Sequence, residues 1–192
     1  MQSDTTEIIT ATREWLEKAV IGLNLCPFAK AVHVRQQIRY VVSHARSTEE
    51  LQADLITELQ TLSEADPEKI DTMLLIHPYV LTDFLDYNDF LDVADATIDA
   101  LGLEGNIQVA SFHPNYQFAG TRADDIQNYT NRSPHPMLHL LREASVERAV
   151  AAFPDAAEIY ERNMETMRAL GKAGWRARLG WNDEDNEKSA NQ

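Results

Sequence analysis

The stretch "DTMLLIHP" at residues 71–78 decides the fold class of this chain. It is a short, continuous apolar run, which is typical of a strand covered on both faces and therefore of a parallel sheet. A second run of this kind, "NIQVASFHP" at residues 106–114, also ends in a His-Pro pair. Because proline cannot donate to a strand ladder, each pair marks the end of a strand. These two strands are the frame of the predicted fold.

Two helical patterns accompany the strands. Residues 83–101 repeat apolar side chains at helical spacing and end before Gly102, which is a typical C-terminal cap. The segment that follows Ser47 has Glu50 at the spacing of a capping box and then leucines at helical intervals up to residue 62. Both segments are expected to be helices, and each one leads into a strand.

The N-terminal part completes the pattern. The stretch "RYVVSHA" at residues 39–45 favours a first strand because of its β-branched pair, and residues 5–22 favour a first helix that ends at Gly22. The alternation of strands and helices predicts an α/β domain: a small, mostly parallel or mixed sheet of about three to four strands with helices packed around it. A split ferredoxin-like arrangement is the alternative.

The C-terminal half is expected to be rich in helix. Residues 114–133 show no clear period, and so long a connection in a compact domain is often functional. A helix is expected to restart within "NRSPHPMLHLLREASVERAVAAF" at residues 131–153, with Pro134 in its first turn. A final helix is expected at residues 154–171, ending at Gly171.

Composition and charge limit the class of protein. With 44% hydrophobic and 25% charged residues, the chain is expected to form one soluble domain at residues 1–181 and an acidic, disordered tail at residues 182–192. A formal charge of −14 repels phosphate backbones, which argues against nucleic acid as a partner. One cysteine forms no internal disulfide, no apolar run reaches the roughly 20 residues that span a bilayer, and no signal-peptide pattern is present. A cytoplasmic protein without membrane contact is therefore expected.

The two His-Pro pairs predict a site. In parallel α/β sheets, ligands bind beyond the carboxyl ends of the strands, so His77 and His113 are expected at the rim of one shared site. His113 opens the long loop and is a candidate general acid or base, while His77 is a candidate substrate-binding residue. In the alternative interpretation, each histidine is structural and only bonds a backbone group.

The long loop adds further candidates. Asn115 is placed to orient a polar group of a substrate, and Tyr116 to form a wall of a pocket. Arg132 stands beside an expected helix N-terminus and, together with Arg122, is a candidate to bind a carboxylate or phosphate. The alternative is an arginine that pins the loop by pairing with one of its aspartates.

Cys26 is a candidate nucleophile. It lies in "GLNLCPFAK" at residues 22–30, where a thiol at a helix N-terminus has a lowered pKa and His113 would serve as its base. Two alternatives stay open for the same side chain: a small buried hydrophobe, or a metal ligand.

His135 and His139 are candidate metal ligands. They lie four residues apart in the expected helix and would share one of its faces, as in zinc-binding helices. Pro136 stands where the "HEXXH" pattern needs a glutamate, so the match is incomplete. A divalent metal, with His113 or Cys26 as a further ligand, is the one cofactor that the sequence suggests.

Three stretches, "GLNLCPFA", "VASFHPNYQFAGT" and "NYTNRSPHPMLHLLRE", together resemble a family of bacterial proteins catalogued as domain of unknown function 1415. The resemblance extends from the first helix to Trp181. It implies relatives of similar length and brings no activity, cofactor or catalytic assignment with it.

Three functions follow as hypotheses. The first is a small cytoplasmic enzyme, a hydrolase or transferase, that acts on a polar or anionic small molecule through His113, Cys26 and Arg132. The second is a metal-binding protein that uses His135 and His139. The third is a non-catalytic module in which the loop at residues 114–133 binds a protein partner. A concave pocket that holds the histidines would favour chemistry, and a flat apolar loop would favour a protein partner.

Overall fold

The computed structural model describes residues 2–152 and 158–180. The tail expected at residues 182–192 and the expected start of the final helix lie outside the described residues. Within the described ranges, no helix is both long and apolar enough to cross a membrane.

The chain folds as a mixed α/β structure around a four-stranded sheet, which confirms the predicted fold class. The strands are β1 (Ile38–Val42), β2 (Thr72–Ile76), β3 (Ile107–Phe112) and β4 (Met137–Arg142), in the spatial order β1-β2-β4-β3. β1 and β2 are parallel, while β4 runs antiparallel to both β2 and β3. β1, β2 and β3 therefore point the same way, and their carboxyl ends lie at one edge of the sheet.

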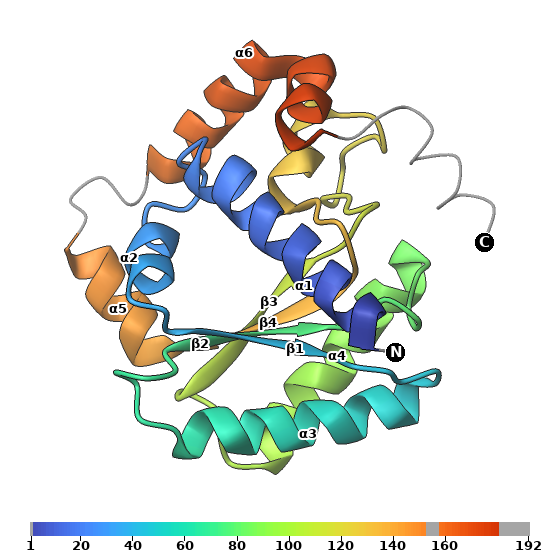
Figure 1. Cartoon of the computed structure of the whole chain (residues 1–192), viewed down its shortest axis with the longest axis vertical. Helices are drawn as coiled ribbons and strands as arrows, with labels where there is room; N and C mark the ends of the chain where they lie inside the picture. Colours follow the sequence, from blue (N-terminus) through green and yellow to red (C-terminus); the bar gives the residue numbers. More distant parts are fainter. Residues whose placement is uncertain (1, 153–157, 181–192) are drawn as a thin grey trace.

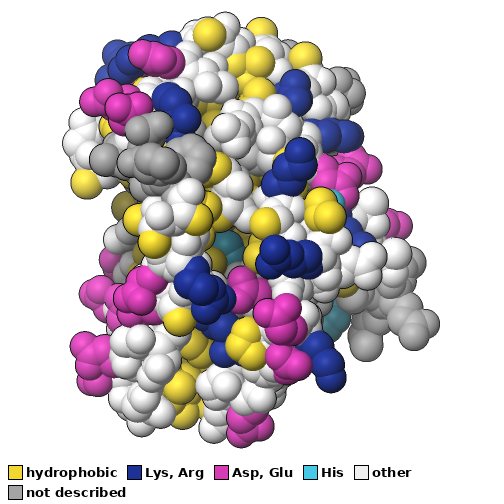
Figure 2. Space-filling view, turned by 90° about the vertical axis from the view of Figure 1, so that its left-hand side faces the viewer, with side chains coloured by type: hydrophobic (Ala, Val, Ile, Leu, Met, Phe, Trp, Pro, Cys, Tyr) yellow, Lys and Arg dark blue, Asp and Glu magenta, His cyan; other side chains and the backbone are white. Residues whose placement is uncertain are grey.

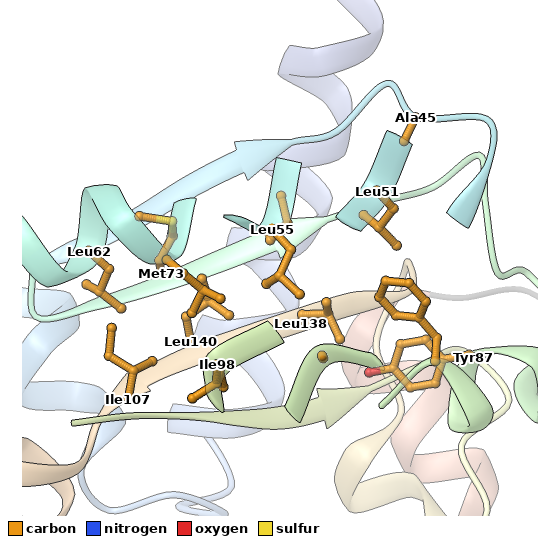
Figure 3. Close-up of a cluster of buried hydrophobic side chains, with 14 of the residues drawn as sticks. Ala45, Leu51, Leu55, Leu62, Met73, Tyr87, Ile98, Ile107, Leu138 and Leu140 are labelled. Atoms are coloured by element: carbon orange, nitrogen blue, oxygen red, sulfur yellow. The ribbon is translucent and has the colours of Figure 1, made fainter. Parts of the chain in front are cut away.

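Two helices cover one face of this sheet (Figure 1): α3 (Thr48–Glu64) and α4 (Phe84–Ala100). The capping box predicted for α3 is present, because the Ser47 side chain accepts a hydrogen bond from the Glu50 backbone N–H and the Glu50 carboxylate accepts one from the backbone N–H of Arg46. The Asp83 side chain caps α4 by accepting hydrogen bonds from the backbone N–H groups of Leu85 and Asp86. Figure 3 shows the core between these helices and the sheet, which includes Leu51, Leu55, Leu62, Met73, Tyr87, Ile98, Ile107, Leu138 and Leu140.

Helical segments from both ends of the chain cover the other face. α1 (Gln2–Trp15) continues directly into a π-helical segment, η1 (Leu16–Ile21), and packs on β1. Both contact a second core that contains Trp15, Leu16, Ala19, Leu74, Ile76, Met137, Tyr129, Met167 and Trp175. The other segments are α2 (Ala29–Val34), a 3₁₀ segment η2 (Ile126–Asn131), α5 (Glu143–Ala151) and α6 (Ile159–Leu179).

Glycines end two of the predicted helices. The helix expected at residues 83–101 is followed by Gly102 in the left-handed conformation, with φ of 66°. Gly171 has φ of 64° and interrupts α6 where the final helix was expected to end, but a second helical part that was not expected continues to Leu179. The first helix ends at Gly22 with helical φ and ψ, and a side chain there would collide with the Lys18 carbonyl and with Arg178.

The prediction of a helix through residues 131–142 was wrong. Met137–Arg142 is strand β4, and a helix begins only at Glu143. β4 lies between β2 and β3, so Leu138 and Leu140 pack against one core while Met137 faces the other. Because both faces are buried, the strand has no alternation of polar and apolar residues that would distinguish it from a buried helix.

Candidate functional site

Histidines gather at the carboxyl edge of the parallel strands. His44, His77 and His113 follow the ends of β1, β2 and β3, and His135 precedes the first residue of β4 at the same edge. Four of the six histidines of the chain therefore lie where α/β folds bind ligands. They differ in exposure, and this difference decides what each can do.

The structure brings His77 and His113 together, on the ring of Tyr87. The ring centroids of His77 and Tyr87 are 5.7 Å apart, and those of His113 and Tyr87 are 5.1 Å apart. Both histidines have no exposed surface. The Tyr87 hydroxyl donates to the carbonyl of Met137 at 2.8 Å and accepts from the backbone N–H of Phe112 at 3.0 Å, which ties the group to β3 and β4.

Backbone groups use the nitrogens of these two rings. His113 Nδ1 accepts a hydrogen bond from the Asn115 backbone N–H at 3.0 Å, so Nε2 carries the proton and donates to the Leu81 carbonyl at 3.2 Å. His77 Nδ1 donates to the Val80 carbonyl at 3.1 Å, and its Nε2 is buried without a partner among the described residues. Together the rings hold the loop between β2 and α4, in which Leu81 has φ of 56°, a conformation that leucine rarely adopts.

Burial also changes the proton affinity of the two imidazoles. Desolvation is the largest cause that lowers the pKa of both His77 and His113 to about 4, against an ordinary value of 6.5. Both rings are therefore neutral near pH 7. This geometry corresponds to the interpretation in which each histidine bonds a backbone group, and it leaves His113 without a free nitrogen for acid–base catalysis.

The loop at residues 114–133 is held by its own side chains. The Arg132 guanidinium donates to the carbonyls of Tyr116 at 3.3 Å and Ala123 at 2.6 Å and lies 4.2 Å from the Tyr129 ring centroid. Its pKa is lowered by burial. Arg132 thus pins the loop, although through carbonyls and a ring instead of the aspartates that the sequence suggested.

The remaining candidates of this loop are near its surface. Arg122 is largely exposed and pairs with Asp124 at 3.4 Å and Asp125 at 3.5 Å. Asn115 is exposed, and its backbone N–H is the group that bonds His113. The Tyr116 ring lies 5.2 Å from Phe84 and helps to cover the buried histidines.

Cys26 and His113 are not brought together. Cys26 precedes α2, which leads into the amino end of β1, whereas His113 follows the carboxyl end of β3. The thiol packs on the core beneath α1 and α6, and burial raises its pKa, although the backbone N–H groups of Phe28 and Ala29 act in the opposite direction. Cys26 is partly buried, and these properties are those of a cysteine with low reactivity.

His135 and His139 do not share a helix face, because the segment is extended. His139 lies within β4 whereas His135 precedes this strand, so the two side chains are not placed one helical turn apart on a common face, as a zinc-binding helix would place them. His139 Nε2 is 2.7 Å from the Thr72 hydroxyl, and burial lowers the pKa of this histidine to about 4. In the ranges that the structure describes, no group of three or more His, Cys, Asp or Glu side chains is arranged to hold a metal ion.

A different set of side chains forms an exposed polar cluster at the same edge. The rim cluster consists of Asp4 from α1, His44 and Arg46 after β1, and Tyr79 after β2. The Tyr79 ring is the centre: the His44 ring stacks at 5.8 Å with an interplanar angle of 19°, and the Arg46 guanidinium lies 4.3 Å from the ring centroid. The Tyr79 hydroxyl donates a short hydrogen bond to the Asp4 carboxylate.

The rim cluster combines groups with distinct electrostatic roles. His44 and Arg46 are exposed, and His44 Nε2 is 3.3 Å from the Thr5 hydroxyl. The hydrogen bond to Asp4 is the largest cause that raises the pKa of Tyr79, so the phenol stays protonated. Among the described carboxylates, none forms an ion pair with the Arg46 side chain, so this cation is available to an anion from solution.

Sequence reasoning missed the rim cluster. One signal was present, since His44 lies near the end of the stretch expected to form the first strand, and His77 and His113 lie at the ends of the next two. The pairing of Tyr79 with Asp4 had no such signal, because it depends on where α1 crosses the sheet. Only the packed structure brings the Asp4 and Tyr79 side chains together.

The fold and the edge define the class of protein: a small, mixed α/β domain with buried histidines that order a loop and an exposed polar cluster beside them. The family described as "Protein of unknown function (DUF1415)" matches residues 7–177, so the chain belongs to this family. No curated protein and no solved structure shows significant similarity to the chain.

Proposed function

We propose that the protein is an enzyme that carries out acid–base chemistry on a small polar or anionic molecule at the rim cluster. The observation that carries this proposal is the meeting of an exposed imidazole, His44, and an exposed guanidinium, Arg46, on the Tyr79 ring. The expected location at the strand ends is kept, while the acid–base role moves from buried His113 to His44.

Each residue has a role that fits its surroundings. Arg46 supplies a planar cation that binds a carboxylate or phosphate through two parallel hydrogen bonds. His44 accepts or donates a proton at the reacting group. The Tyr79 phenol stays protonated because it donates a hydrogen bond to the Asp4 carboxylate. Its ring holds the His44 and Arg46 side chains by direct contact. The buried pair His77 and His113 positions the loop that carries Tyr79.

The local cation matters because the chain carries a formal charge of −14. An anion approaches such a protein only where a positive group is not already paired. Two acidic residues follow Arg46 closely in sequence: the Glu49 carboxylate accepts a hydrogen bond from the Thr48 hydroxyl at 3.3 Å, and the Glu50 carboxylate accepts one from the Arg46 backbone N–H at 2.7 Å. The proposal retains a cytoplasmic enzyme, as expected from the sequence.

The alternative of a metal-binding protein has less support. The helix on which His135 and His139 were expected to align is a strand, and the two side chains have separate surroundings. The alternative of a protein-binding loop also has less support, since Arg132 and the ring contacts of Tyr116 hold the loop against the domain.

Anion binding tests the proposal without knowledge of the substrate. Inorganic phosphate and succinate are titrated into labelled protein while the ring signals of His44 and Tyr79 are followed by NMR. We expect saturable shifts with at least one anion and about tenfold weaker binding in Arg46→Gln, the effect of losing one charge-assisted hydrogen bond. Arg35→Gln, which removes an exposed arginine at the end of α2, is the matched control and should bind as the parent does.

Turnover is the second measurement. A panel of phosphate esters and carboxylate esters is screened, and His44→Ala should lower any turnover by about 10²- to 10⁴-fold while the urea unfolding midpoint is unchanged. If neither anion shifts the His44 ring, or if Arg46→Gln binds as well as the parent, the rim cluster is not the site.

A further inference from the structure

The layer formed by α3 and α4 has an unusual charge distribution. Neither helix contains a lysine or an arginine, and each carries five acidic residues: Glu49, Glu50, Asp54, Glu58 and Glu64 on α3, and Asp86, Asp89, Asp92, Asp95 and Asp99 on α4. Figure 2 shows acidic and apolar side chains at the lower end of the molecule, where α3 lies in Figure 1. Acidic residues alone are common on solvated helices, so the shape of the surface between them is decisive.

A groove runs between the two helices. Its first part, of about 370 Å³, lies over Ile56, Val93, Ala96 and Ala100, and its second part, of about 490 Å³, lies between the N-terminal turns of the helices. Both parts are lined by Val93 and by Gln52, whose amide donates to the Thr97 hydroxyl at 3.1 Å across the floor. The two depressions therefore form one continuous groove.

The ends of the groove differ in chemistry. Apart from Gln52, Asp92 and Thr97, the side chains that line the first part are aliphatic, and Val93 keeps 37% of its surface exposed there. The second part is rimmed by Glu49, Asp86 and Asp89. A molecule that fits must place apolar groups over Ile56 and Ala96 and positive groups against the carboxylates.

We infer that this groove binds an amphipathic, basic α-helix of a partner protein. From Asp86 to Ala100 the wall formed by α4 is about 21 Å long, which matches roughly four turns of helix. The small side chains of Ala96 and Ala100 allow a third helix to approach closely, and apolar residues at helical spacing would fill the floor. Lysines or arginines at one end would complement the acidic rim, and the same acidic field excludes nucleic acid as the occupant.

This surface is separate from the proposed catalytic role. The groove shares no lining residue with the rim cluster, which is formed by α1 and the ends of β1 and β2, although Thr48 and Leu81 in its second part lie two residues from Arg46 and Tyr79. Asp86 and Asp89 have no role in the rim cluster. A failure of one proposal therefore leaves the other unaffected.

The test uses the full chain and two synthetic peptides. One is a helix of about 18 residues, long enough for the groove, with leucines at i, i+3, i+4 and i+7 and lysines on its other face. The other has the same composition in scrambled order, and therefore the same charge without an apolar face. We expect the first to bind at least about tenfold more tightly by calorimetry, because only it can bury apolar surface in the groove. NMR shifts should map to α3 and α4.

Matched variants distinguish binding in the groove from nonspecific electrostatic attraction to the acidic surface of the protein. Ala96→Arg obstructs the floor and should weaken binding by about tenfold or more, as loss of a central contact does. The pair Asp86→Asn and Asp89→Asn should weaken binding severalfold and reduce its salt dependence, while Glu64→Gln with Asp95→Asn, which removes the same charge outside the groove, should not.

Three results would overturn the inference. In the first, the scrambled peptide binds as tightly as the amphipathic one. In the second, both charge-matched double variants lose the same amount of affinity. Either result would show a general electrostatic attraction to an acidic protein and no specific binding in the groove. The third is self-association of the protein alone that Ala96→Arg abolishes in sedimentation, because a second copy would then occupy the groove.

Discussion

Acidification should destabilise this protein through the pair His77 and His113 and, in β4, through His139, whose pKa burial also lowers to about 4. His77 and His113 have pKa values of about 4 in the folded protein because burial penalises the charged ring, against 6.5 when exposed in the unfolded chain. The unfolded state therefore binds more protons between these values. The free energy of unfolding is unaffected above pH 6.5 and falls as the pH decreases from 6.5 toward 4.

The size of the effect follows from the same pKa values. A difference of 2.5 pKa units amounts to about 3 kcal/mol per histidine when the pH reaches 4, and to about 3.4 kcal/mol well below that pH. At pH 5 each histidine has lost about 2 kcal/mol, so the pair should lower the free energy of unfolding by about 4 kcal/mol relative to pH 7. Such a loss is a large fraction of the stability of an ordinary domain.

Urea unfolding at half-unit steps from pH 8 to pH 4.5 measures this loss. His113→Gln should be less stable than the parent at pH 7 but should lose about 2 kcal/mol less between pH 7 and pH 5, since one titrating group is gone. Tyr87→Phe serves as a control that destabilises the same cluster without removing a histidine. Equal pH slopes for the parent and His113→Gln, or ring signals of His113 that titrate near pH 6.5 in the folded protein, would refute the reasoning.

Three further outcomes follow from individual contacts. Tyr87→Phe leaves a carbonyl of β4 and an N–H of β3 without their partner and should lower the free energy of unfolding by about 3 kcal/mol, measured by urea unfolding; a loss below about 1 kcal/mol would contradict the described bonds. Arg132→Gln should speed amide hydrogen exchange across residues 114–133, whereas Arg122→Gln, which breaks exposed ion pairs, should change it little. Cys26 should react slowly with iodoacetamide, with a rate that keeps rising above pH 9, since burial raises its pKa; a plateau near neutral pH would contradict this.

Local sequence patterns predicted those helices and strands that can be recognised from residues adjacent in sequence. Four of the five buried residues of β2, at positions 73–76, form a continuous apolar run, and α3 begins at Thr48 because the Ser47 side chain caps it. β4 was not predicted as a strand because a central strand is apolar on both faces and because Pro134 suggested the start of a helix. Its place between β2 and β3 depends on partners distant in sequence.

The candidate site was predictable in location only. Histidines at strand ends indicated the correct edge, because strand direction follows from the order of elements. Whether a ring is sealed or exposed depends on the loop after β2 and on the Tyr87 side chain, which come from another part of the chain. His113 is therefore buried while His44 is exposed, although both follow a strand in the same way.

The insertion of β4 between its two neighbours has a consequence for biosynthesis. β2 and β3 do not pair with each other, and each lacks one ladder partner until residues 137–142 have left the ribosome, because β4 pairs with both. A nascent chain that ends before residue 137 exposes two strands whose backbone groups are unpaired on the side that β4 will occupy. Such a chain is prone to aggregate with other chains. Premature stop codons before residue 137 should thus yield insoluble fragments, and translation pauses in this interval should increase the need for chaperones.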